Sequence, residues 1–572
     1  MKKTIAFLTS LIVGACCFVG CKPNIIQQED PTKAHHLYVG IFNGGYGKAW
    51  LEKAAEDFCK IYDDVQILID DKKDEFQTNN LKDKIVDTYS NDLYLAPTNY
   101  MQMVYDETYM AMDITDIVTS PVNLKGGVSD SSIESRMKES FRDFYNIGTT
   151  ENPKYYAVPI GGSIWGLNYD YDLFEEKSLF ISGYDEEEEE YVFTSGKEGD
   201  KPKSVGRDGV SGTYDDGTPA TWSEFKILLA EMKSKSVTPF IWAENMSSYR
   251  YFFLMSLWAD YEGKENMENA LRMNGAEIDI YDTSKSDVND QKSHAAAMAS
   301  KDRKVAISDD TGYYLSQMKG KAAALEFAEL IMDKNYYDER SLKSTTDFIQ
   351  AQSFYVQSKK FATEPNGKRV AFLIDGGHWY SEIKEYSDTF TKENYPEYKN
   401  GRRFSVMPFP KFDTSENETA TYLCSSSQFA AFIRKNAKEK EVAKNFLQYL
   451  MTTNVIKQTA LGTGMTMFYD YTVEKSELSS LPYYYQIIEE INQSDKTALV
   501  NEQCNTKFYK NNTKYQIKQN LLWKGSYNLR ELSDAFVDFK NYSSLSTYKY
   551  MKAAETYYTA SYWSNQYHVG KN

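Results

Sequence analysis

The sequence predicts an α/β fold that begins with an open, parallel sheet. Residues 37–42 form an apolar run of strand length, and the glycine-rich turn 43–47 follows it directly. Apolar residues then recur at helical spacing over 51–61, and strand-like runs follow at 65–69 and 93–95. Strands that alternate with helices in this way require right-handed crossovers between parallel strands. Because ligands of such sheets bind beyond the carboxyl ends of the strands, the turn at 43–47 lies where binding is expected.

The middle of the chain combines an insertion with a clearly marked helix start. Residues 184–216 are acidic and glycine-rich, with five consecutive glutamates at 186–190, which predicts an exposed insertion. Downstream, Thr221 and Glu224 have the spacing of a capping box. In that motif the threonine hydroxyl accepts a hydrogen bond from a backbone amide of the first turn, and the glutamate bonds back to the cap. A helix is therefore expected to start directly after Thr221.

The second half of the chain contains two further strand-like runs and a long polar end. Residues 370–374 are an apolar run typical of a buried strand, which ends at Asp375 and a glycine pair, and Trp379 follows closely. Residues 404–407 indicate another strand. The last segment, 481–572, is polar and tyrosine-rich and is predicted to be helical.

The composition favours a folded, acidic protein that is rich in aromatic rings. The 572 residues include 65 Lys and Arg and 82 Asp and Glu, so the formal net charge is −17. This balance argues against a surface for nucleic acid or anionic membranes, because phosphate binding needs clustered positive charge. The hydrophobic share of 41% is large enough for sizeable cores. Because aromatic rings stack on sugars, the 46 tyrosines and 8 tryptophans hint at carbohydrate, although most of them are expected in the core.

The N-terminus has the features of a lipoprotein signal. Two lysines precede an uncharged stretch that ends before Cys21 and is shorter than the ~20 residues of a membrane span. The residues around Cys21 resemble a bacterial lipobox, in which the cysteine becomes acylated. Residues 1–20 are therefore expected to be a cleaved signal peptide, Cys21 the lipidated residue (a palmitate site), and 21–36 a flexible tether. Cys16 fits the same pattern and is an alternative lipid site, and a plain secretory signal is another alternative.

Sequence motifs of catalysis are absent. The chain has no Gly-x-Ser-x-Gly element, no His-Glu-x-x-His motif and no phosphate-binding glycine loop, and its cysteines match no zinc spacing. We therefore predict no enzyme activity, no cofactor and no metal. An anchored glycoside hydrolase stays an alternative, because its two carboxylates, about 5–10 Å apart in space, leave no motif in a sequence.

Four groups of segments together resemble one known family. They are the opening strand with the turn 43–47, residues 155–159 with 168–174, residues 221–225 with 238–242, and residues 370–379 with 404–408. In this order they are similar to the extracellular solute-binding proteins of family 1. These are the carbohydrate-binding lipoproteins of ABC transporters, and their plan is like that of maltose-binding protein.

The resemblance implies a two-lobed, periplasmic-binding-protein-like fold of type 2, with a hinge and a ligand cleft. Lobe 1 would comprise 37–158 and 428–470, and lobe 2 would comprise 159–427 and 471–572. The implied protein is a monomer that captures an extracellular carbohydrate, an oligosaccharide in the preferred interpretation, and delivers it to ABC transporter permease subunits. Its lipid would hold it on the outer face of the bacterial cell membrane. The identity of the sugar, the permease, and the choice between a Gram-positive surface and a periplasm are left open.

Seven residues are expected to contact the sugar. Trp379 and Trp165 are selected because each lies just past a strand-ending or crossover segment that the resemblance places at the cleft. Phe240 and Trp242 resemble the aromatic cleft segment of the family. Core packing is the alternative role for each ring. The residues expected to hydrogen-bond sugar hydroxyls are Asn43, Tyr46 and Asp375, and Asp375 has capping of its own turn as an alternative.

A surface glycan-binding lipoprotein of the SusD-like type is the other functional alternative. It shares the size, the anchor and the aromatic richness of this chain. It would be all helical, however, which the strand pattern at the start of the chain disfavours.

Overall fold

The computed structural model describes residues 28–71, 91–97, 110–361, 368–398, 400–502 and 532–567. The expected signal peptide and both candidate lipidation sites, Cys21 and Cys16, lie outside the described residues. No described helix combines the length and the apolar character that crossing a lipid bilayer takes.

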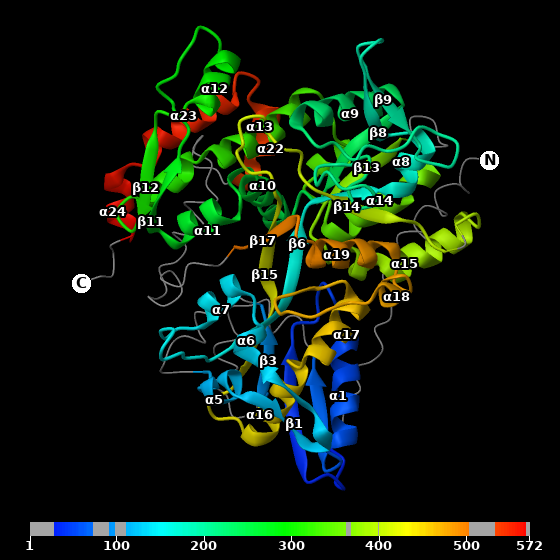
Figure 1. The fold of residues 1–572 in the computed structure, drawn as a ribbon, viewed down its shortest axis with the longest axis vertical. Coiled ribbons are helices and arrows are strands. Elements are labelled where there is room, and N and C mark those ends of the chain that lie inside the picture. Colours follow the sequence, from blue (N-terminus) through cyan, green and yellow to red (C-terminus); the bar gives the residue numbers. More distant parts are fainter. Residues whose placement is uncertain are drawn as a thin grey trace, which may run out of the picture.

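Two α/β lobes are stacked along the long axis of the molecule (Figure 1). The first lobe is built on β1, which pairs in parallel with β2 on one side and with β3 on the other. The predicted parallel sheet is therefore confirmed. The helices α1 and α16 pack on each other through Phe58 and Phe446, whose ring centroids are 5.1 Å apart. The elements of this lobe are β1 (His35–Ile41), α1 (Ala49–Ile61), β2 (Val65–Asp70), β3 (Leu93–Ala96), α5 (Thr115–Thr119), β4 (Pro121–Asn123), β5 (Ser129–Ser132), α6 (Ile133–Arg136), α7 (Glu139–Tyr145), α16 (Lys440–Leu450) and α17 (Thr453–Thr463).

Two long strands run between the lobes, β6 (Val158–Trp165) and β15 (Ala420–Ile433). The end of β15 pairs with β3 in the first lobe, whereas its beginning pairs with β17 (Thr497–Asn501). β6 lies antiparallel to β15 along both parts, and its other edge pairs with β16 (Thr466–Met467). The lobe limits expected at 158/159 and 427/428 fall within these two strands, and the full assignment of residues to lobes stays a prediction.

The second lobe is built on a mixed sheet with the strand order β10-β13-β7-β14. Asp170, at the end of β7, is fully buried and forms ion pairs with Arg369 of β13 and with Arg402, which precedes β14. These two pairs tie three strands together at one end of the sheet. The sheet and the helices around it are β7 (Leu167–Asp170), α8 (Tyr171–Lys177), α9 (Trp222–Ser234), β10 (Val237–Trp242), α10 (Ser247–Glu262), α13 (Lys319–Asp333), α14 (Phe348–Phe361), β13 (Arg369–Ile374), α15 (Trp379–Asn394), β14 (Phe404–Met407), α18 (Lys475–Leu478) and α19 (Tyr483–Gln493).

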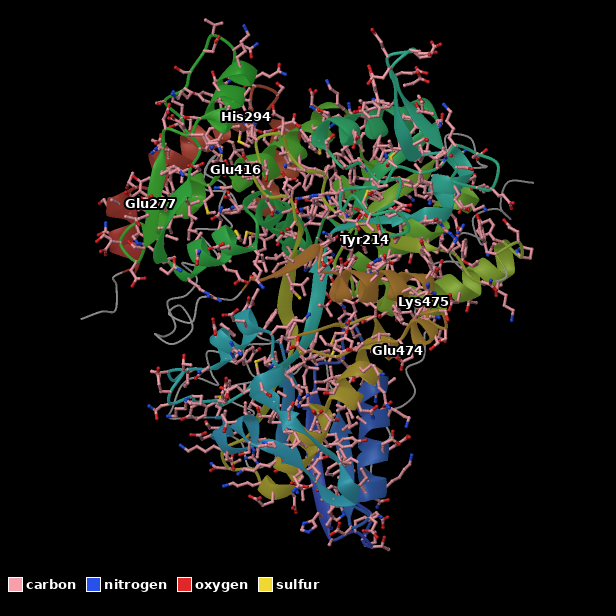
Figure 2. All side chains as sticks on the ribbon, viewed as in Figure 1. Tyr214, Glu277, His294, Glu416, Glu474 and Lys475 are labelled. Atoms are coloured by element: carbon pink, nitrogen blue, oxygen red, sulfur yellow. The ribbon has the colours of Figure 1, made fainter. Side chains whose placement is uncertain are left out.

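Three further parts of the chain pack on the second lobe: the acidic insertion, residues 264–308 and the C-terminal helices. The acidic insertion forms a hairpin that projects from the molecule, with its glutamates at the exposed tip. Further along the insertion, Tyr214 is buried near the middle of the molecule (Figure 2), with its hydroxyl 3.0 Å from that of Tyr422 in β15. The C-terminal helices pack against α13 and α12. These outer elements are β8 (Phe180–Asp185), β9 (Glu190–Thr194), α11 (Lys264–Arg272), β11 (Asn274–Asp279), α12 (Asp290–Ala299), β12 (Lys304–Ser308), α22 (Ala535–Asn541), α23 (Thr547–Tyr557) and α24 (Ala560–Tyr567).

Most of the local predictions are confirmed by these elements. The capping box is present as expected, because the Thr221 side chain accepts from the amide of Glu224 and the Glu224 carboxylate accepts from the amide of Thr221. The strand predicted at 370–374 is β13. The prediction that 481–572 is wholly helical is wrong at β17, which gains its strand partners from β15, a segment far from it in the sequence.

Candidate ligand-binding site

The turn after β1 lies at the junction of the two lobes. Its glycines Gly45 and Gly47 have φ angles of 60° and 67°, a backbone conformation that favours glycine. The Tyr46 hydroxyl lies 2.9 Å from Ser163 Oγ in β6, and it donates to the carbonyl oxygen of Gly162 at 3.2 Å. The amide of Gly45 donates to Glu382 Oε1 of α15 at 3.2 Å. The first lobe therefore contacts both a crossing strand and a helix of the second lobe through this turn.

A buried histidine extends these contacts across the junction. His378 lies just before α15 and is 3% exposed. Its Nδ1 lies 2.9 Å from Ser163 Oγ, and its Nε2 lies 3.1 Å from the Tyr249 hydroxyl of α10. A neutral imidazole offers one donor and one acceptor, so both ring nitrogens are used. Hydroxyl and imidazole groups thus form a continuous chain from Tyr46 through Ser163 and His378 to Tyr249.

Two carboxyl groups lie beside this chain. Gln352 Nε2 donates to Asp375 Oδ2 at 3.0 Å and to Glu382 Oε2 at 2.9 Å, so one buried amide holds both groups. Asp375 Oδ1 accepts from the amide of Gly376 at 2.8 Å and lies 3.6 Å from His378 Nε2. Burial, together with the nearby charge of Glu382, raises the pKa of Asp375 well above its ordinary value. Asp375 therefore keeps its proton to a higher pH than an exposed aspartate does.

The ring of Trp165 packs against other aromatic rings at the same junction. The centroid of its ring is 5.5 Å from that of Tyr249, 5.2 Å from that of Phe252 and 5.9 Å from that of His378. Burial, followed by the charges of Glu382 and Asp375, raises the pKa of Tyr249 well above its ordinary value, so its hydroxyl stays protonated. Rings next to hydroxyl, amide and carboxyl groups are the side chains that recognise sugars and other polar solutes.

The structure places four of the seven expected contact residues at this junction and three in the core of the second lobe. Tyr46, Trp165 and Asp375 belong to the cluster, and Asn43 lies in the same turn, where its amide donates to Asp71 at 3.1 Å. Trp379, Phe240 and Trp242 are each 0% exposed, and Trp165 and Asp375 are each 1% exposed, so burial does not separate the two groups. Which of the seven residues contact a ligand stays a prediction.

The three buried rings have partners that explain their position. Trp379 donates from Nε1 to Asn168 Oδ1 at 3.2 Å and packs edge-on against Phe404, with centroids 5.1 Å apart. Phe240 stacks on Phe372 of the neighbouring strand at 4.9 Å. Trp242 stacks at 4.8 Å on Phe536, so α22 packs against it. These contacts make all three rings core residues.

Sequence reasoning missed five residues of the cluster: Ser163, Tyr249, Gln352, His378 and Glu382. A usable signal existed for two of them, since His378 follows the glycine pair and Glu382 lies one helical turn later. Ser163, Tyr249 and Gln352 lie on other elements and carry no local signal. Among the described residues, no group of three His, Cys, Asp or Glu side chains is arranged to hold a metal ion.

Comparison with known proteins finds no matching family model and no matching curated protein. Solved structures do match. A probable secreted solute-binding lipoprotein from Streptomyces coelicolor is similar with a TM-score of 0.53 at 11% identity, over 93% of this chain and 100% of that one. A structure from work on xylan utilization by the thermophilic bacterium Caldanaerobius polysaccharolyticus has a TM-score of 0.52 at 14% identity, over 91% and 99%. The cyclic α-maltosyl-1,6-maltose binding protein from Arthrobacter globiformis has a TM-score of 0.51 at 12% identity, over 93% and 100%.

At these identities the likeness concerns the fold. It extends along nearly the whole of this chain, and the lobes and crossing strands described above agree with it. The helical fold required by the SusD-like alternative is not the fold observed. The chain therefore has the two-lobed α/β fold, of the type 2 periplasmic-binding-protein class, that the extracellular solute-binding proteins share.

Proposed function

We propose that this protein captures an extracellular carbohydrate, in the preferred case an oligosaccharide, between its two lobes and delivers it to an ABC importer without chemical change. The observation that carries the proposal is the chain of polar groups from Tyr46 through Ser163 and His378 to Tyr249, with Trp165 beside it. The matched structures support the sugar class, since one is named for a cyclic maltose derivative and another belongs to work on xylan utilization.

The chemistry of the cluster suits sugar hydroxyls. A hydroxyl both donates and accepts, and the tyrosine, serine and imidazole groups of the cluster do the same. In the structure these groups bond to one another across the junction, as do the Gly45 amide and Glu382. A sugar would take over these bonds when the lobes separate and close again about the crossing strands β6 and β15. The ligand would shift the balance of conformations only by the extent to which it binds the closed form better.

The proposal includes a lipid anchor at Cys21, a tether over 21–36 and release of the sugar to permease subunits at the outer face of the cell membrane. The acidic net charge of −17 gives the protein no general attraction for anionic lipid, so attachment would depend on the acyl chains. We propose a monomer as the working form.

The first test compares two histidine variants in a thermal-shift screen against mono- and oligosaccharides. A binding sugar at a hundredfold excess over its Kd stabilises the protein by about 2.7 kcal/mol. His378→Asn is expected to weaken binding about tenfold, because it removes a buried hydrogen-bonding group, and so to reduce this stabilisation to about 1.4 kcal/mol.

The matched control is His294→Asn. His294 is also a hydrogen-bonded histidine, near Tyr281 and Glu326, but it lies in the outer part of the second lobe (Figure 2). This variant is expected to keep the full sugar response. A shift produced by peptides or polyamines and by no sugar would contradict the carbohydrate assignment. Release of sugar from a polymer by the purified protein would favour the hydrolase alternative.

A further inference from the structure

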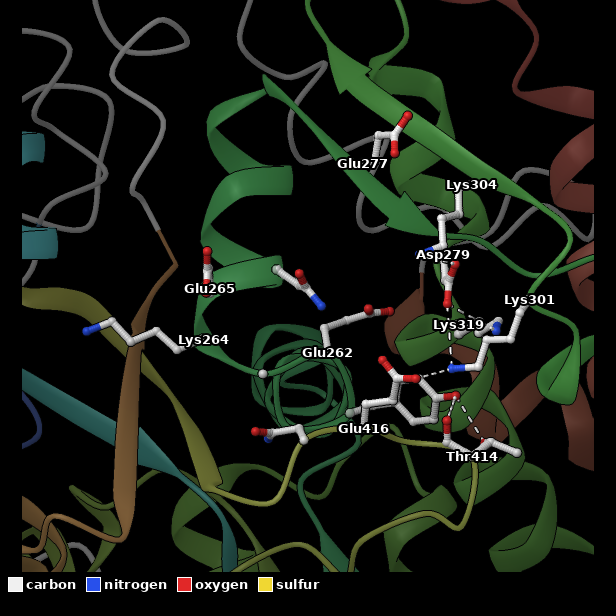
Figure 3. A pocket seen from close by; sticks show the side chains of 14 residues that line it. Glu262, Lys264, Glu265, Glu277, Asp279, Lys301, Lys304, Lys319, Thr414 and Glu416 are labelled. Atoms are coloured by element: carbon white, nitrogen blue, oxygen red, sulfur yellow. Dashed lines mark hydrogen bonds and ion pairs between the residues drawn. The ribbon is translucent and has the colours of Figure 1, made fainter.

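A cavity of about 380 Å³ lies in the second lobe, away from the lobe junction. Two of its residues, Glu277 and Glu416, are labelled in the outer part of that lobe in Figure 2. The cavity is formed where the end of α10 and the start of α11 meet β11, the segment leading into β12, the start of α13 and the loop 414–417 (Figure 3). Its volume is within the range of about 300–1,000 Å³ that is usual for small-molecule sites. Three lysines line it: Lys301 and Lys304, whose side chains are 50% and 58% exposed, and Lys319, which is 3% exposed.

Three ammonium groups converge on one carboxylate in this cavity. Nζ of Lys301, Lys304 and Lys319 lies 3.7, 3.8 and 4.0 Å from an oxygen of Asp279. Lys301 also forms an ion pair with Glu416, whose side chain is 82% exposed. All three lysine–aspartate distances exceed those of a good hydrogen bond. The carboxylate of Asp279 therefore leaves much of the donor capacity of the lysines unused.

Lys319 is the most buried of the three lysines and has few hydrogen-bond acceptors close to its ammonium group. It is the first residue of α13, and its side chain is only 3% exposed. Its ammonium donates to the carbonyl oxygen of Ser300 at 2.6 Å, while Asp279 is 4.0 Å away. An ammonium has three donors, so this buried group can still donate toward the cavity. A desolvated cation with free donors is matched by a ligand that brings charged acceptor oxygens.

Glu262 is a second carboxyl group that lines the cavity. Its Oε1 accepts from the amide of Gly320 at 2.6 Å, and burial raises its pKa to about 7. The groups that face it are Lys319 of α13, Asp279 of β11, Lys301 and Lys304 near β12, and Glu416 of the loop. The carboxylates of Glu265 and Glu277 are directed away from Asp279 (Figure 3). When Glu262 is protonated, one negative charge fewer opposes the three lysines.

We propose that this cavity is a second solute site, which binds the carboxylate of an acidic monosaccharide, a hexuronate, between Lys301, Lys304 and Lys319. The ring of Tyr261 and the side chains of Thr414 and Asn417 line the remaining wall, next to the sugar ring. The incoming carboxylate replaces Glu416 at Lys301, since Glu416 is exposed and free to turn into solvent. This proposal is independent of the proposed sugar site between the lobes.

Calorimetric titration of the purified protein at pH 6 with glucuronate, glucose and inorganic phosphate tests the proposal. Glucuronate is expected to bind, and glucose, which lacks the carboxylate, is expected to bind this cavity at least about tenfold more weakly. The double variant Lys301→Met/Lys304→Met is expected to lower glucuronate affinity about tenfold. Lys334→Met is the control, because Lys334 is about as exposed as Lys304, at 56% against 58%, and lies outside the cavity. His378→Asn, at the lobe junction, is expected to leave glucuronate binding unchanged.

The pH dependence gives a second readout. Between pH 6 and 8 Glu262 loses its proton and repels the anion, so glucuronate affinity is expected to fall about tenfold. In Glu262→Gln the neutral amide removes this change, and the affinity at pH 8 is expected to equal that at pH 6. Glucuronate binding that is indifferent to the lysine variants would overturn the proposal. Binding of phosphate without glucuronate would overturn the hexuronate assignment. Loss of glucuronate binding in His378→Asn would place that ligand at the lobe junction instead.

Discussion

Replacing Trp379 with alanine is expected to lower the free energy of unfolding by about 3–5 kcal/mol, because it empties a large, fully enclosed space. The ring is 0% exposed and packs against Tyr355, Phe404 and Tyr484, with centroids 5.1 to 5.6 Å away. Its Nε1 also holds Asn168, which in turn donates to the carbonyl oxygen of Asp375 at 2.7 Å. Urea denaturation followed by circular dichroism measures the loss.

Trp379→Phe is the matched control. It keeps most of the ring volume and removes the hydrogen bond to Asn168, so we expect a loss of only about 1–2 kcal/mol. The sugar response of this variant should be preserved, since the ring packs among Tyr355, Phe404 and Tyr484. A Trp379→Ala protein that is as stable as the parent but has lost its response to sugar would show that the ring contacts the ligand.

Replacing Lys321 with methionine is expected to stabilise the protein by about 3–5 kcal/mol at pH 6. Lys321 lies in α13, is 0% exposed, and its Nζ has no hydrogen-bond partner within the described part of the chain. Its Nζ lies 5.9 Å from the centroid of the Tyr558 ring. Burial lowers the pKa of Lys321 to about 7 from an ordinary value of 10.5. Methionine keeps an unbranched side chain of similar length and buries no charge.

The gain from Lys321→Met is expected to depend on pH with a defined sign. Because the folded pKa is lower than the unfolded one, the unfolded state binds more protons between pH 7 and 10.5. The stability of the parent protein therefore rises with pH across this window through this group, and below pH 7 the full cost of burying the charge is present. The difference between variant and parent should shrink steadily from pH 7 to 10.5. A difference that is constant with pH would mean that Lys321 is not buried as an ammonium.

The expected secondary structure was largely correct because it depends on residues that are near one another in the chain. The capping box at Thr221 and Glu224 needs only a spacing of three residues, and it is present as expected. The apolar run at 370–374 became β13, and the turn at 43–47 lies at the lobe junction because it follows a parallel strand at its carboxyl end. The strand β17 was missed because its pairing partner, β15, is far away in the sequence.

The candidate site was only half predictable from the sequence. His378 and Trp379 are neighbours at the start of α15, where consecutive side chains diverge by about 100°. His378 therefore faces Ser163 and Tyr249, whereas Trp379 faces Phe404 in the core. Both rings follow the same glycine pair, so no local pattern distinguishes them.

The sequence alone thus determined the α/β class, the main strands and helices, and the placement of the first turn at a ligand-binding edge. The tertiary structure decided which rings face the lobe junction, that Phe536 stacks on Trp242, and that three lysines meet at Asp279. The physical reason is that periodicity and capping are set by neighbours within a few residues. The surroundings of a buried side chain are instead set by elements that the chain brings together from distant positions.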